Sequence, residues 1–68
     1  MRYEMIIYWS EADDAFIAEV PELPGCLADG ERYEKAVANA LKVIQQWIDT
    51  AKELGRPIPK PKGRLAYA

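Results

Sequence analysis

Residues 21–30, Pro-Glu-Leu-Pro-Gly-Cys-Leu-Ala-Asp-Gly, decide how this chain folds. Each proline fixes its own φ angle and removes a backbone donor, so this stretch predicts a shaped loop and excludes the interior of a helix. Leu27 and Ala28 are compatible with a short third strand before Asp29 and Gly30. The loop therefore separates an alternating sequence pattern on its N-terminal side from a helical pattern on its C-terminal side.

The segment before the loop predicts a β-hairpin. Residues 2–9 alternate, which puts one apolar and aromatic set on one face and Ile6 and Tyr8 on the other. The first set is Tyr3, Met5, Ile7 and Trp9. Because both faces carry apolar residues, we expect this strand to be central or covered on its second face. Residues 10–14 predict a turn with three acids, and residues 15–20 predict the returning strand.

The segment after the loop predicts one long helix over residues 31–54. Its apolar residues recur at helical spacing and form a single stripe. The stripe consists of Tyr33, Val37, Ala40, Leu41, Ile44, Trp47, Ile48 and Ala51. Gly55 is placed to end the helix in the left-handed conformation, and Pro57 forbids continuation. Arg32 cannot accept a hydrogen bond from the helix amides, so we expect Asp29 or Gly30 to start the helix.

The predicted fold is a small α+β domain of order β-β-β-α-β. Three or four antiparallel strands lie under a single long helix, which covers one face of the sheet. Residues 1–61 form the domain, and residues 62–68 form either a basic tail or a short edge strand. The uncovered sheet face is apolar in part, so we expect it to be an association surface.

The composition limits the classes of function. No cysteine pair can form, because Cys26 is the only cysteine, and the chain has no histidine, so we expect no metal, no cofactor and no catalytic residue. No apolar run spans a membrane and no signal peptide is recognisable, so we expect a cytoplasmic protein. Residues 1–31 hold eight acids against Arg2, a balance of −7, which suits a basic partner. Five cations against Glu53 in residues 50–68 are too few to predict nucleic-acid binding.

The order of these features resembles the HicB family of antitoxins, in particular its N-terminal domain. The resemblance covers residues 3–61 and rests on the hairpin, the loop, the helix and the tail together. The matching residues are Val20-Pro21-Glu22-Leu23-Pro24-Gly25-Cys26, Gly30, Ala36, Asn39, Trp47-Ile48 and Gly55-Arg56-Pro57-Ile58-Pro59-Lys60-Pro61. The resemblance implies a degraded ribonuclease-H-like fold without activity. It also implies binding to a HicA-like toxin, a small basic ribonuclease that cleaves messenger RNA and whose catalytic surface the antitoxin masks.

Six residues are candidates for the partner interface: Tyr8, Trp9, Asp13, Asp14, Glu22 and Leu23. Trp9 fits either the edge of the core or an exposed anchor, and Glu22-Leu23 fits either a structural or a contacting role. Asp13 and Asp14 also suit a solvated turn. We expect a homo-oligomer, dimer or tetramer, because so small a domain buries a marginal core. Two alternatives stay open: a stand-alone oligomeric domain with another protein or small-ligand partner, and a residual nucleic-acid binder or nuclease.

Overall fold

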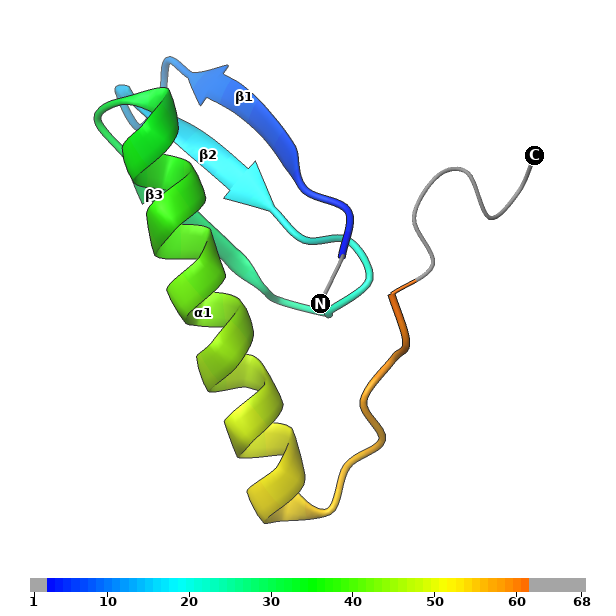
Figure 1. The fold of residues 1–68 in the computed structure, drawn as a ribbon. Helices are drawn as coiled ribbons and strands as arrows, with labels where there is room; N and C mark the ends of the chain where they lie inside the picture. The colour runs from blue at the N-terminus through cyan, green and yellow to red at the C-terminus, as the bar shows by residue number, and fades with distance from the viewer. Residues whose placement is uncertain (1–2, 62–68) are drawn as a thin grey trace, which may run out of the picture.

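The computed structural model describes residues 3–61, which form three strands and one helix. The elements are β1 (Ile6–Ser10), β2 (Ala15–Glu19), β3 (Leu27–Gly30) and α1 (Tyr33–Leu54). The strands are antiparallel in the order β1-β2-β3, and α1 lies across one face of the sheet (Figure 1). The α+β prediction is confirmed, whereas its ribonuclease-H-like detail stays a prediction. The strand or basic tail predicted for residues 62–68 lies outside the described residues.

Small side chains bring the helix close to the sheet. Four buried alanines form the contact: Ala18 on β2, Ala28 on β3, and Ala36 and Ala40 on α1. Gly30 at the end of β3 lies so near the helix that an added Cβ would sit 2.5 Å from the backbone nitrogen of Ala36. Interiors are packed at crystal-like density, so such a contact leaves no room for a methyl group. The alanines and Gly30 therefore fix the separation between α1 and β3.

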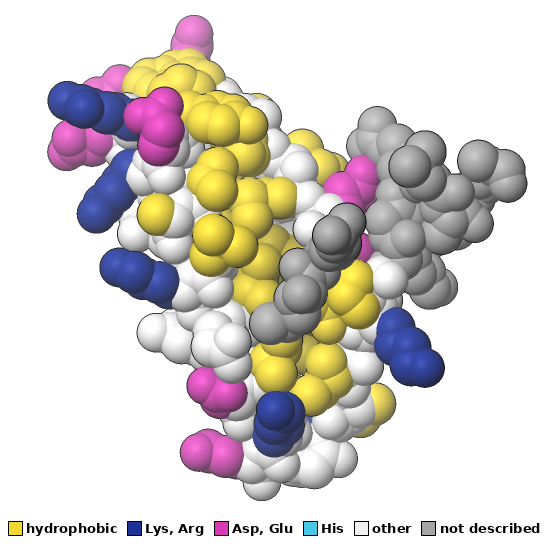
Figure 2. Space-filling view, in the orientation of Figure 1, with side chains coloured by type: hydrophobic (Ala, Val, Ile, Leu, Met, Phe, Trp, Pro, Cys, Tyr) yellow, Lys and Arg dark blue, Asp and Glu magenta, His cyan; other side chains and the backbone are white. Residues whose placement is uncertain are grey.

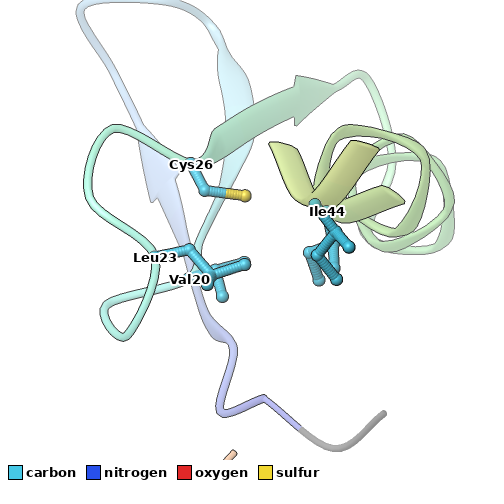
Figure 3. Close-up of a cluster of buried hydrophobic side chains, with 5 residues drawn as sticks. Val20, Leu23, Cys26 and Ile44 are labelled. Atoms are coloured by element: carbon cyan, nitrogen blue, oxygen red, sulfur yellow. The ribbon is translucent and has the colours of Figure 1, made fainter. Parts of the chain in front are cut away.

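Larger side chains fill the other end of the core, under the proline-framed loop. Figure 3 shows Val20, Leu23 and Cys26 facing Ile44 of α1, and Ile48 completes this buried cluster. Full burial of one such aliphatic side chain contributes about 1.5–3 kcal/mol relative to exposure. The loop is therefore part of the core, and it closes the end of the helix–sheet sandwich.

Two successive turns shape that loop. The Leu23 N–H donates to the Val20 carbonyl (3.1 Å), and the Cys26 N–H donates to the Leu23 carbonyl (2.9 Å). Gly25 has a φ of 77°, as the third residue of a type II turn with proline at its second position requires. The Val20 N–H also donates to the Cys26 carbonyl (2.9 Å), so the loop is closed at its base. The prediction of a shaped loop is confirmed.

The start of the helix differs from the sequence prediction. Asp29 and Gly30 belong to β3, and Arg32, with an extended φ of −127° and no side-chain cap, precedes the first helical residue. The expectation that Asp29 or Gly30 starts α1 was therefore wrong. The physical reason is that Gly30, as the last residue of β3, packs against the backbone of α1 at Ala36, so the helix begins only after it.

The end of the helix agrees with the prediction. Gly55 has a φ of 68°, and its N–H donates to the Lys52 carbonyl (3.2 Å) while the Arg56 N–H donates to the Ala51 carbonyl (2.8 Å). This pair of bonds is a Schellman motif, which satisfies two carbonyls that the end of a helix leaves unpaired.

β1 differs from the expectation of a central or doubly covered strand. Within residues 3–61 it is an edge strand, since β2 lies in the middle, and its second face has no covering layer. The central position was therefore wrong, because apolar residues on both faces of a strand mark two contact surfaces and do not require a strand on either side. Cover of the second face by another molecule stays a prediction. The proline-rich segment after α1 returns to the core between helix and sheet, where Ile58 packs against the cluster of Val20 and Leu23 and the Tyr3 hydroxyl donates to the Pro59 carbonyl.

Candidate functional site

The sheet face opposite α1, here called the open sheet face, has no covering layer among the described residues. Its apolar side chains come from all three strands: Ile6 and Tyr8 on β1, Ile17 on β2 and Leu27 on β3. Ile6, Tyr8 and Leu27 are 40%, 43% and 51% exposed, whereas the central Ile17 is 7% exposed. Exposed large apolar side chains that surround a buried one are typical of a contact surface.

The strand register arranges this face in two rows across the sheet. Ile6 pairs with Glu19, which pairs with Leu27, and Tyr8 pairs with Ile17, which pairs with Asp29. Neighbouring strands lie about 4.8 Å apart. Each row therefore sets one carboxylate beside apolar side chains, and Glu19 has an apolar neighbour on either side.

Glu19 and Tyr8 interact directly on this face. The Tyr8 hydroxyl donates a long hydrogen bond of 3.4 Å to Oε1 of Glu19. Desolvation and then the negative charge of Glu19 raise the pKa of Tyr8, with a smaller contribution from Asp13. The phenol therefore stays protonated and remains a donor at neutral pH.

A second apolar surface, here called the helix-side surface, lies on the face that carries α1. Trp9 packs edge-on against Phe16 (5.0 Å between ring centroids), and Phe16 packs edge-on against Tyr33 (6.3 Å). Leu41, two turns along α1 from Tyr33, is 59% exposed. Figure 2 shows hydrophobic side chains in a band along this side of the molecule, with both basic and acidic side chains along its border.

The predicted interface residues separate onto different surfaces. Tyr8 lies on the open sheet face, and Trp9, the next residue along the strand, lies on the helix-side surface. Asp13 and Asp14 are exposed in the turn between β1 and β2, where they line a hollow with Asp29. Asp13 is tied to the strand end, because its N–H donates to Oγ of Ser10 (3.3 Å) and its carboxylate accepts from the same hydroxyl (2.9 Å).

The two loop candidates have structural contacts. Leu23 is 1% exposed and lies in the core, so a partner can reach only the backbone around it. Oε1 of Glu22 accepts a hydrogen bond from the Glu4 N–H (3.1 Å), and the Trp47 indole donates to the Pro24 carbonyl (3.0 Å). Of the two roles open for Glu22-Leu23, these contacts favour the structural one.

The six predicted interface residues did not include Ile6, Glu19 and Leu27, although the sequence pattern had placed Ile6 on the same face as Tyr8. Alternation finds Ile6, because residues at even spacing within one strand share a face, but Glu19 and Leu27 lie on other strands and are placed on this face only by the strand register. The same rule shows that Tyr8 and Trp9 cannot point to one surface. Leu27 was harder to assign, since its strand is only four residues long.

Groups for catalysis or metal binding are few in the part of the chain that the structure describes. Residues 3–61 contain no cluster of three His, Cys, Asp or Glu side chains that could hold a metal ion. Cys26 is buried, and its burial raises the pKa of the thiol, which disfavours the reactive thiolate. Over the same residues, α1 lacks the length of apolar sequence needed to cross a membrane.

Comparison with known proteins gives consistent results. The family model of HicB-like antitoxins of bacterial toxin–antitoxin systems matches residues 3–66. A UPF0150 protein of Synechocystis sp. is 35% identical over 66 residues, which cover 97% of this chain and 89% of that protein. A UPF0150 protein of Thermoplasma acidophilum is 33% identical over 60 residues, which cover 88% of this chain and 86% of that protein. No solved structure matches the chain. Because the family match spans nearly the whole chain, the protein belongs to the HicB-like antitoxin family.

Proposed function

We propose that this chain is an antitoxin that binds a HicA-like, messenger-RNA-cleaving toxin and blocks cleavage by covering the toxin's active surface. The observation that carries the proposal is the family match over residues 3–66. Family membership favours a binding role over a catalytic one. Because the proposed target cuts messenger RNA, the proposal places the chain in the cytoplasm.

The charge distribution supports this choice of partner. Residues 3–31, which form the three strands, the turn and the loop, contain eight acids and no Lys or Arg. A ribonuclease that binds RNA carries basic side chains where it contacts phosphates. Complementary charge speeds the encounter of two proteins and selects against wrong partners.

We also propose that two copies of the chain associate through the helix-side surface. Glu34, Leu41 and Lys52 are separated by seven and eleven residues, or about two and three turns, so they lie on one flank of α1. In an antiparallel pair of helices, Glu34 of one copy would face Lys52 of the other. Charges of both signs around an exposed leucine make this flank self-complementary, as a two-fold interface requires.

Co-expression tests the toxin-binding proposal. A HicA-like toxin should stop cell growth when expressed alone, and co-expression of this chain should restore growth. Size exclusion with light scattering should then give one complex that contains both proteins. If growth stays blocked and the chain elutes as a homo-oligomer without the toxin, the antitoxin proposal fails and the stand-alone oligomer with another ligand replaces it.

A further inference from the structure

We infer that the toxin binds the open sheet face, and that this face is not where two copies of the chain meet. The inference rests on the proposed antitoxin function and assigns a surface to it. The face is exposed, its carboxylates lie beside apolar side chains, and its charge is of a single sign.

The face offers both apolar contact and fixed acceptors. Ile6, Tyr8 and Leu27 are each about half exposed around the buried Ile17. Glu19 sits between Ile6 and Leu27 in the cross-strand register. Lys and Arg side chains bury their aliphatic stems along apolar surface while the charged end reaches an acceptor. A basic side chain of the partner can therefore lie on Ile6 or Leu27 and place its charge at Glu19.

A hydrogen bond already orients the Glu19 carboxylate on β2. The Tyr8 hydroxyl donates to Glu19, whose side chain is half-buried between its strand neighbours. A side chain that is held before binding loses less conformational entropy when the complex forms. Glu19 is therefore suited to accept a charged donor from a partner.

Charge sign decides between a toxin and a second copy. Two open sheet faces packed against each other would bury Glu19 and Asp29 of both copies in one interface. Residues 3–31, which build the face, contain no Lys or Arg to compensate. Placing like charges opposite each other costs several kcal/mol. A basic partner meets no such penalty.

Two exposed leucines provide a matched test. Leu27 on the open sheet face is 51% exposed, and Leu41 on the helix-side surface is 59% exposed. We expect Leu27→Lys to weaken toxin binding at least tenfold and to leave the oligomeric state unchanged. Leu41→Lys should change the oligomeric state and bind the toxin with wild-type affinity. Glu19→Gln, which keeps the size of the side chain, should also weaken binding at least tenfold and make it less sensitive to salt.

Binding is measured by calorimetry with the full chain and the purified HicA-like protein, and circular dichroism confirms that each variant folds. If the wild-type chain binds the toxin and both Leu27→Lys and Glu19→Gln bind it equally well, the inference is overturned while the proposed function stands. An oligomer that dissociates in Leu27→Lys but not in Leu41→Lys also overturns it. If the wild-type chain does not bind the toxin, the proposed function fails and the inference falls with it.

Discussion

Replacing Gly30 with alanine tests the contact that sets the position of the helix. An added Cβ would lie 2.5 Å from the Ala36 nitrogen and 2.8 Å from the Lys35 carbonyl carbon, against 3.4–4 Å for ordinary contact. The start of α1 must therefore move by at least 3.4 − 2.5 = 0.9 Å. All the atoms in the way belong to the backbone, so no side chain can rotate aside. Overpacking of this kind costs about 1–3 kcal/mol, a large share of the roughly 3–10 kcal/mol expected for a domain of this size.

Urea unfolding followed by tryptophan fluorescence, at one fixed protein concentration, measures this cost. With a slope of about 1 kcal/mol/M for a small domain, the midpoint should fall by about 1–3 M. Gly25→Ala is the matched control, because an added Cβ there meets nothing within 4 Å and only the φ of 77° opposes it. That variant should lose about 1–2 kcal/mol, the cost of the left-handed conformation for a residue with a Cβ. In Gly30→Ala, the Asn39 amide should also lose its 2.7 Å bond to the Asp29 carbonyl. A Gly30→Ala midpoint equal to the wild type would refute the close contact.

Three further predictions concern the core and the open sheet face. Leu23→Ala should lower the free energy of unfolding by about 2–5 kcal/mol in the same urea assay, because Leu23 is fully buried, and a loss under 1 kcal/mol would contradict its place in the core. Cys26 should react with a thiol reagent only as fast as the protein opens, because its side chain is buried. Burial also raises the pKa of the thiol, so the stability that the buried neutral thiol contributes is fully present below the ordinary thiol pKa and is lost as the pH rises through the raised pKa. The pKa of Tyr8 is measured by ultraviolet titration, as the signal that is lost in Tyr8→Phe. It should lie above the ordinary tyrosine value and fall in Glu19→Gln, and the same pKa in the wild type and in Glu19→Gln would contradict the contact.

The helix and its end were the most predictable parts of the fold. The helical period is enough to predict the helix, although Tyr33 and Leu41 of the predicted stripe are exposed and the buried Ala36 was not in it. The stop at Gly55 needs only local backbone geometry. The start of α1 was not predictable in the same way. Nothing local to Gly30 shows that a helix backbone will lie against it, because that contact comes from the packing of β3 on α1.

The candidate site was predictable in part. Alternation along β1 is enough to place Tyr8 and Trp9 on opposite faces, and the run of acids without a cation is visible in the sequence. The role of Leu23 was not visible, because prolines around a leucine indicate a rigid loop but not the direction of its side chain. The pairing of Glu19 with Ile6 and Leu27 depends on the strand register, which only the three-dimensional structure supplies.

The most direct test of the central claim is a titration of RNA cleavage by the purified HicA-like toxin with increasing amounts of this chain. The account predicts that cleavage falls in proportion to added chain and stops once every toxin molecule is bound. At toxin concentrations below the wild-type dissociation constant, it also predicts that Leu27→Lys needs at least tenfold more protein for half inhibition. Cleavage that continues unchanged at a large excess of the wild-type chain would contradict the antitoxin function.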